Sequence, residues 1–355
     1  MKLHPLRAHW LSGLLFLGLI VFLLLNSGCS RQLPSQYFRL LSFGTLVELE
    51  VIGVDERRAR EAYETLQQDF TFMHHTWHAW KPGPLGRVNE AIAEGRTIAA
   101  PPSVLPLLKV SQKLAAKSDY LFDPGIGKLI ELWGFHKDNL QPHAPPPAEK
   151  IAAILAQHPS IRDVHLDGFH LACDNPTVKL DFGAIGKGYG IDRAIERLKE
   201  MGITDAIVNA GGDLRAIGSR DGNPWRIAIR DPDGGGIFAL LSVSGDEAVF
   251  TSGNYERNFT WEGKFYHHII DPRTGYPAEG TASVTVLHPD ATTADAAATA
   301  LFIAGPKNWY RIARQMGVKF VLLIDTQGEV YMNPAMQKRV ELQKPVAEIH
   351  ISKPL

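Results

Sequence analysis

The chain has 355 residues, of which 45% are hydrophobic and 21% are charged. This length suits one large domain or two modest ones, and the composition excludes a disordered, collagenous or coiled-coil protein. Two cysteines exclude a disulfide scaffold, and the near balance of 37 basic and 38 acidic residues argues against a nucleic-acid-binding surface.

The N-terminus has the pattern of a bacterial export signal. A basic start and an apolar run from Leu11 to Leu25 precede Ser27-Gly28-Cys29, and this run is shorter than the roughly 20 residues of a membrane span. We predict that residues 1–28 are a lipoprotein signal peptide, that Cys29 carries lipid, and that residues 29–355 form the folded domain. An uncleaved anchor helix is the alternative, and either version keeps the chain at the membrane and outside the cytoplasm.

Periodicity predicts helices and strands without a regular βαβ repeat. Alternation predicts a strand over Thr45–Ile52, apolar spacing predicts a helix over Glu56–Met73, and a helix is expected to resume at Ala148 after the Pro-rich loop 141–147. Further predicted strands are Ala206–Asn209, Trp225–Arg230, Phe238–Val243, Ser283–Leu287 and Lys319–Ile324, and further predicted helices are Ile191–Met201, Thr293–Ala304 and Lys307–Met316. Strand groups interrupted by helices predict an α+β fold with mixed sheets in a single large domain.

A glycine-rich loop is predicted within residues 179–192 (KLDFGAIGKGYGID). A strand is expected to end at Asp181 and to run through several glycines into a helix. Glycines let the backbone approach a ligand, free N–H groups at a helix start favour phosphate, and Lys187 adds a positive charge. Because the GxxxxGK[ST] and GxGxxG patterns are absent, a purely structural turn is an equal alternative from these residues alone.

A second glycine-containing segment, Asn209–Gly218 (NAGGDLRAIG), follows an apolar strand. Its paired glycines allow a ligand or another strand to approach closely, and Asp213 is suited to accept a hydrogen bond from a hydroxyl. A tight turn between two strands explains the same residues equally well.

Two histidines precede a sharp turn. His267 and His268 abut an apolar pair, and Asp271-Pro272-Arg273-Thr274-Gly275 follows. Histidine is suited to take a proton from an attacking hydroxyl near neutral pH. Neighbouring strand side chains face opposite ways, so only one of the two points into a given site. A lone strand histidine is more often structural, but the adjacent acid and turn favour a functional role here.

The segment Thr292–Thr299 (TTADAAAT) opens a helix of small residues. Asp295 and Thr299 are four residues apart and therefore lie on one helix face. Their oxygens suit Mg²⁺ or Ca²⁺, although a second segment must contribute ligands because two groups alone make a poor metal site. An aspartate stabilised by the helix dipole is the structural alternative.

Together these segments resemble the ApbE family, the FAD:protein FMN transferases. The matching stretches run in the family's order over nearly all of the mature chain: Phe43-Gly44-Thr45, Phe122-Asp123-Pro124, Leu132-Trp133-Gly134-Phe135, Leu180–Asp192, Val208–Leu214, Ser252–Asn254, His268–Gly275 and Asp295–Thr299.

The resemblance implies an enzyme at the periplasmic face of the inner membrane that binds FAD and a divalent cation, Mg²⁺ or in its place Ca²⁺ or Mn²⁺. It implies that FMN passes from FAD to a threonine hydroxyl of a partner protein and that AMP is released. Typical acceptors in the family are subunits of sodium-pumping quinone reductase or of Rnf-type complexes.

The resemblance also implies roles for individual residues. Asp295, Thr299 and the Ala184 carbonyl would bind the metal, and His268 matches the histidine implicated in catalysis. Contacts with FAD are expected from Phe43, Leu121, Phe122, Asp123, Asp181, Lys187 and the Ile269 backbone. Phe43 stands where many members have Met beside the flavin. The usual stacking Tyr is replaced by Trp77 or Trp80, of which the spacing to Asn89 favours Trp80.

We hypothesise that His268 accepts the proton of the acceptor threonine and that Asp271 orients it. Two other functions fit the same residues. One is an FAD pyrophosphatase that uses water as the acceptor and releases FMN and AMP. The other is a non-catalytic, membrane-tethered flavin-binding lipoprotein.

Overall fold

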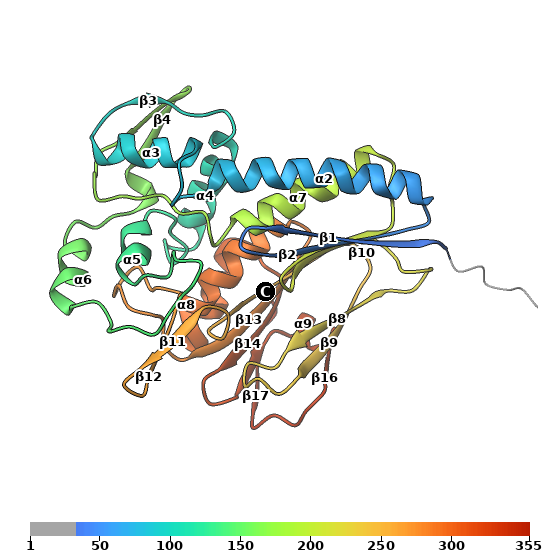
Figure 1. Ribbon diagram of the computed structural model, residues 1–355. Helices are drawn as coiled ribbons and strands as arrows, with labels where there is room; N and C mark the ends of the chain where they lie inside the picture. The colour runs from blue at the N-terminus through green and yellow to red at the C-terminus, as the bar shows by residue number, and fades with distance from the viewer. Residues whose placement is uncertain (1–32) are drawn as a thin grey trace, which may run out of the picture. The chain divides into compact units, whose positions relative to one another are not determined.

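A nine-stranded sheet organises the fold of the computed structural model, which describes residues 33–355 (Figure 1). In sheet order its strands are β1 (Ser35–Ser42), β2 (Thr45–Ile52), β6 (Ala206–Ala210), β7 (Asp213–Gly218), β10 (Gly245–Gly253), β13 (Thr281–His288), β14 (Phe320–Asp325), β15 (Val330–Met332) and β17 (Ile349–Ile351). Neighbouring strands are antiparallel except β15 and β17, which are parallel.

The other strands of the described residues form three smaller sheets. They contain β8 (Trp225–Arg230) with β9 (Ile237–Val243) and β16 (Val340–Leu342), β11 (Asn258–Trp261) with β12 (Lys264–His267), and β3 (Ile98–Ala99) with β4 (Val164–Asp167) and β5 (His170–Cys173). Trp225 and Phe238 of the first of these pack with Leu214, Val249 and Leu322 of the large sheet. This apolar layer covers one face of the large sheet.

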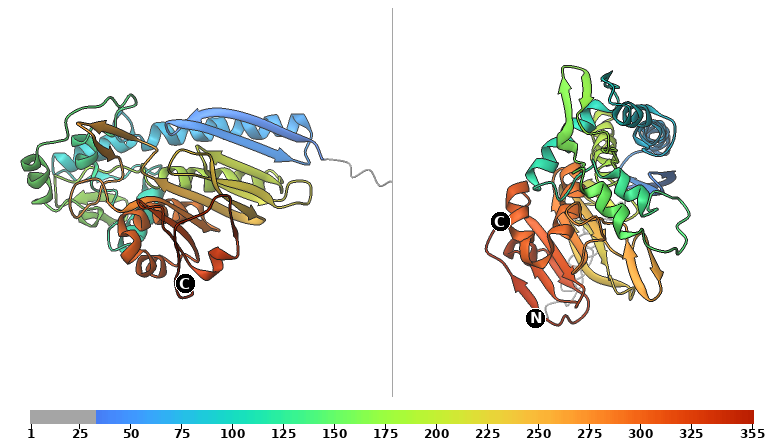
Figure 2. Two further views of the ribbon diagram at one scale, coloured as in Figure 1. Left: turned by 90° about the horizontal axis from the view of Figure 1, so that it is seen from below. Right: turned by 90° about the vertical axis from the view of Figure 1, so that its left-hand side faces the viewer.

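Helices cover the opposite face. The principal ones are α2 (Glu56–Trp77), α7 (Gly186–Glu200) and α8 (Ala291–Met316), and Figures 1 and 2 show the β1–β2 hairpin running alongside α2. The remaining helices of the described residues are α3 (Pro84–Ala93), α4 (Leu105–Lys117), α5 (Gly127–Leu132), α6 (Ala148–Leu155), α9 (Pro334–Gln337) and the 3₁₀ turn η1 (Ile161–Asp163).

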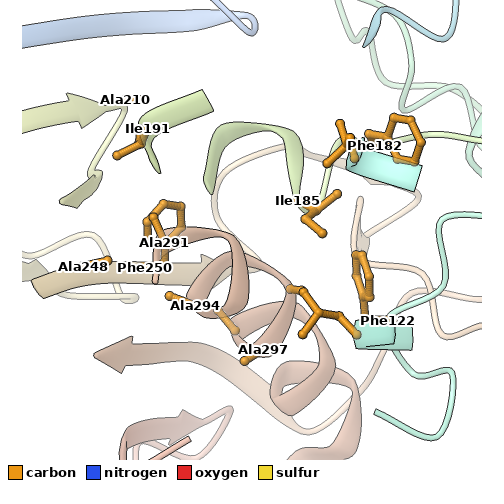
Figure 3. Packing of buried hydrophobic residues seen from close by; sticks show 14 of the residues in the cluster. Phe122, Phe182, Ile185, Ile191, Ala210, Ala248, Phe250, Ala291, Ala294 and Ala297 are labelled. Atoms are coloured by element: carbon orange, nitrogen blue, oxygen red, sulfur yellow. The ribbon is translucent and has the colours of Figure 1, made fainter. Parts of the chain in front are cut away.

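The α8 helix combines the two helices predicted from the sequence. It begins after Asp290, whose carboxylate accepts a hydrogen bond from the Thr293 N–H, and it breaks at Gly305, whose φ of 67° lies outside the helical region. Pro306 follows this break, as the predicted boundary before Gly305-Pro306 requires. Figure 3 shows Ala291, Ala294 and Ala297 of α8 beside Ala248 and Phe250 of β10. Small side chains thus let α8 lie close to the sheet.

The predicted α+β architecture is confirmed, with two local errors. The glycine-rich segment predicted as a loop is helical from Gly186 onward, so Lys187 lies in α7. The strand expected to end at Asp181 is absent, because the segment forms only a single bridge between Lys179 and Ile126. The predicted signal peptide and Cys29 lie outside the described residues. Within residues 33–355 no helix is both long and apolar enough to cross a membrane.

Candidate active site

Segments far apart in the sequence meet at the turns between strands and at the starts of α7 and α8. The β1–β2 turn reaches both the β6–β7 turn and α7. A Cβ at Gly211 would lie 2.4 Å from Thr45 Oγ1, and one at Gly190 would lie 2.8 Å from the Phe43 ring. Glycine at these two positions therefore permits the close approach that brings Phe43 to the same place as α7.

The predicted metal ligands lie where α7 and α8 cross. Asp295 is buried, and its Oδ2 accepts a hydrogen bond of 2.8 Å from the Gly188 N–H. A Cβ at Gly188 would lie 2.4 Å from the Ala291 carbonyl oxygen, so this crossing requires glycine. Thr299 lies one turn beyond Asp295, with Oγ1 3.3 Å from the Ser252 hydroxyl.

Burial raises the pKa of the Asp295 carboxyl to about 7, opposed by the nearby Lys187 ammonium and reinforced by Asp213. A bound cation would stabilise the charged form of this carboxylate, which burial disfavours. Within the described residues its Oδ1 forms no hydrogen bond. Thr299, one helical turn away, and its neighbour Ser252 add hydroxyl oxygens. This set of oxygens fits a hard divalent cation.

Lys187 forms an ion pair with Asp213. The charges of Asp213 and Asp295 raise the pKa of Lys187 in spite of its burial, so the ammonium is retained. Asp213 is held in turn by the Thr251 N–H, 2.9 Å from Oδ1. The structure thus joins the start of α7, the start of β7 and β10 around one positive charge.

Asp192 is a supporting residue that sequence reasoning missed. Its carboxylate accepts hydrogen bonds from the N–H groups of Ala291 and Thr292 at the start of α8, each at 2.8 Å, and from the Thr292 hydroxyl at 2.6 Å. It also pairs with the buried Arg215 at 2.6 Å, and Arg215 pairs with Asp246 at 2.7 Å. Asp192 therefore fixes α8, and with it Asp295, against α7 and β7.

The two neighbouring histidines have different surroundings, since β12 ends at His267 and His268 follows it. His267 Nε2 lies 2.8 Å from the Ala278 carbonyl, while the buried Nδ1 of His268 makes no hydrogen bond within residues 33–355. Burial, together with the nearby His267 and Lys187, lowers the pKa of His268 to about 3. His268 is thus a neutral imidazole with a free buried nitrogen, near the Lys187 charge. Buried polar atoms without partners are uncommon and need an explanation.

Asp271 does not orient His268, and that expectation is wrong in this structure. Its carboxylate binds Arg273 instead, at 2.9 Å from the backbone N–H and 2.7 Å from Nη2. The Asp271 carbonyl also accepts a hydrogen bond of 2.8 Å from the Gly275 N–H. Asp271 therefore builds the turn that follows His268, a role typical of aspartate before Pro.

Trp77 and Trp80, the two alternatives for stacking on the flavin, differ in how far they are buried. Trp77 is buried, stacks on Phe43 with ring centroids 6.1 Å apart, and donates a hydrogen bond to the Ser103 carbonyl. Trp80 is only partly buried, and the Lys179 ammonium lies 4.2 Å from its ring centroid. Trp80 is therefore more exposed than Trp77, and its contact with the flavin stays a prediction.

Other predicted FAD contacts have side chains that serve the fold. Leu121 and Phe122 are buried, and the Asp123 carboxylate accepts hydrogen bonds from the N–H groups of Gly125 and Ile161 and from the Ser160 hydroxyl. The side chains of this segment are therefore engaged within the protein, and its contact with FAD stays a prediction.

The Asp181 segment is held by Asn89, a second residue that sequence reasoning missed as a site component. The Asn89 side chain makes hydrogen bonds of 2.9 and 2.7 Å with the carbonyl and N–H of Leu180. Asp181 Oδ1 accepts the Gly183 N–H at 2.9 Å, and burial raises the pKa of its carboxyl. The Ile269 N–H and carbonyl are bonded to His267 Nδ1 and to the Ala278 N–H.

Solved structures share this fold over their whole length. The chain aligns with the ApbE protein of Thermotoga maritima at a TM-score of 0.79 and 32% identity, covering 86% of this chain and 99% of that one. It aligns with the flavin transferase ApbE of Vibrio cholerae at a TM-score of 0.74 and 28% identity, covering 86% and 100%. The fold is therefore the one that these ApbE structures have.

The sequence comparisons agree. The ApbE family profile matches residues 43–322, and the chain belongs to the ApbE family. It is 44% identical to an FAD:protein FMN transferase of Rhodobacter capsulatus over 84% of this chain, which spans 57% of the length of that relative. It is 32% identical to the protein of the same description in Klebsiella pneumoniae, covering 82% of this chain and 86% of the relative.

Proposed function

We propose that this chain is an FAD:protein FMN transferase that uses a divalent cation, Mg²⁺ by preference, and releases AMP. Relatives carrying this description support the proposal, as does the family membership of the chain. The observation that carries it is the buried Nδ1 of His268, which has no hydrogen-bond partner among the described residues and belongs to a neutral ring near the Lys187 charge. Lys187 in turn lies near the Asp295 carboxylate.

The reaction needs one bond to form and one to break. The oxygen of an acceptor threonine attacks the phosphorus of the FMN half, the pyrophosphate P–O bond breaks, and AMP departs with the bonding electrons. His268 takes the hydroxyl proton, because its imidazole is neutral at physiological pH and holds an unused lone pair.

The remaining residues bind and orient the substrate. Asp295 and Thr299, with the Ala184 carbonyl, would hold the cation, which supplies charge neutralisation on the pyrophosphate when bound. Lys187 adds a second positive charge, which its pairing with Asp213 keeps protonated. Phe43 and Trp80 offer aromatic surfaces to FAD, and the Asp181 loop offers its backbone.

We also propose that Cys29 carries lipid and holds the protein at the periplasmic face of the inner membrane. The apolar run before Ser27-Gly28-Cys29 supports this arrangement. The acceptors in this proposal are flavoprotein subunits of sodium-pumping quinone reductase or Rnf-type complexes, as the family resemblance suggests.

The test incubates the full-length chain in detergent with FAD, Mg²⁺ and a candidate acceptor. Flavin fluorescence should stay with the acceptor on a denaturing gel, and an equal amount of AMP should be released. Free FMN with AMP, and no linked flavin, would identify a pyrophosphatase and overturn the transfer. Intact FAD would overturn both enzymatic readings and favour a binding protein.

A further inference from the structure

Two histidines at the C-terminal end of α2 hold the main chain of two aromatic residues of the site. His74 lies in the last turn of the helix, and His78 is the residue that directly follows it. His74 and His78 are four residues apart, and their ring centroids lie 5.4 Å from each other. His74 Nδ1 accepts a hydrogen bond of 3.2 Å from the Phe43 N–H, and His78 Nδ1 accepts one of 3.1 Å from the Trp80 N–H. Both bonds require a lone pair on Nδ1.

This bonding defines the protonation of the pair. A neutral imidazole whose Nδ1 accepts a hydrogen bond carries its proton on Nε2, whereas a protonated imidazole has no acceptor at all. Burial lowers the pKa of both histidines, with further lowering by the Lys81 charge. His75 and, at His78, the charge on His74 act in the same direction, while Asp138 opposes them. Both rings are therefore neutral at pH 7, and acid removes both acceptors.

The hydrogen bond from the Phe43 N–H stabilises an unfavourable backbone conformation. It is the first residue of the two-residue turn between β1 and β2, and its φ of 52° lies in the left-handed region that bulky residues avoid. Its ring is fixed by Trp77 and by the close approach of Gly190. His74 supplies the main-chain contact that stabilises this strained conformation, and such strain is common at functional sites.

We propose that His74 and His78 are positioning residues for FAD binding: as neutral acceptors they hold the backbones of Phe43 and Trp80, and protonation releases both. This inference rests on the proposed function, which assigns Phe43 and Trp80 to FAD. It adds an acid-sensitive step in substrate binding that involves neither the metal ligands nor His268.

The first test measures FAD binding to the full-length chain by flavin fluorescence, without cation or acceptor, so that turnover does not enter. At pH 7.5, His74→Leu and His78→Leu should each weaken binding roughly two- to tenfold, the effect of one lost hydrogen bond. His74→Asn and His78→Asn should restore it, because the Asn oxygen takes the place of Nδ1. His75→Leu, at an exposed position of the same turn, is the matched control and should bind as the wild type does.

The second test varies pH. Wild-type affinity should be constant at neutral pH and above. It should fall as the pH passes through the pKa values of His74 and His78, which burial places below the ordinary value of about 6.5. The His74→Asn/His78→Asn double variant should lose this dependence, because an amide does not titrate. Full acid sensitivity in the double variant, or unchanged binding by the Leu variants, would overturn the inference.

A third measurement is independent of FAD. Nitrogen-15 NMR of the histidine rings should find His74 and His78 protonated on Nε2 at pH 7.5, and protonation on Nδ1 would overturn the inference even if the Leu variants fail to fold. A wild-type chain that binds FAD but transfers no FMN would defeat the proposed function and leave this inference standing.

Discussion

The crossing of α7 and α8 and the turn that follows β12 differ in whether their polar groups are bonded within the protein. At the crossing, the charged groups are paired within the protein: Lys187 with Asp213, Arg215 with Asp192, and Asp295 with the Gly188 N–H. At the turn, His267 and Asp271 are bonded to neighbouring groups, but the buried Nδ1 of His268 is not. The comparison separates groups that maintain the site's shape from a group left available for chemistry.

A large effect is expected at Asp295, which belongs to both categories because it accepts the Gly188 N–H and, among the described residues, keeps one oxygen free. Asp295→Asn should reduce FMN transfer at least about 100-fold by removing the charge that binds the cation. Stability above pH 7 should not fall, because burial raises the pKa of Asp295 to about 7 and the folded state therefore disfavours its charge.

Initial transfer rates and thermal unfolding measure the two effects. A chelator added to the wild-type chain is the control, and it should cause the same loss reversibly. Wild-type transfer by Asp295→Asn would show that this carboxylate does not bind the cation.

Glycine substitutions test the helix crossing itself. Gly188→Ala should destabilise the fold by about 3 kcal/mol, since its Cβ would meet backbone atoms of α8. Gly186→Ala, two residues earlier in α7, is the matched control because its Cβ would have open space. Denaturant unfolding compares the two variants, and equal stability would contradict the close approach of α7 and α8.

His267, which is hydrogen-bonded to Ala278, should lower the stability of the fold in acid. Burial lowers the pKa of His267 to about 4, so the unfolded chain binds more protons than the folded chain once the pH falls below about 6.5. This residue alone should cost about 2 kcal/mol of stability between pH 7 and pH 5.

His267→Gln removes the titration and retains a donor for the Ala278 carbonyl, so it isolates the contribution of His267. Urea unfolding at several pH values should give the variant a shallower loss of stability in acid. An identical pH dependence would mean that His267 is not a buried neutral group.

Local patterns predicted the elements well because they depend on near neighbours. Alternation predicted β2 at its observed bounds, and the apolar spacing that predicted Glu56–Met73 continues in α2 to Trp77. The predicted strand ending at Asp181 fails because no neighbouring strand pairs with it beyond the single bridge at Lys179.

The contacts that support the site could not be predicted from the sequence. The bonds from Gly188 to Asp295 and from Asn89 to Leu180 join residues about a hundred positions apart, and no local signal indicates them. The prediction that Asp271 orients His268 failed for a different reason. Asp271 is near His268 in sequence, but the turn directs its carboxylate to Arg273. Family resemblance proposed the residues of the site, while only the fold reveals which of them are already bonded.

The most direct test of the central claim compares His268→Ala with the wild type at saturating FAD, Mg²⁺ and acceptor. The account predicts an initial rate of FMN transfer roughly 100- to 10,000-fold lower, with FAD affinity within about threefold of the wild type, because His268 moves a proton and does not hold the substrate. A wild-type rate in His268→Ala would contradict it.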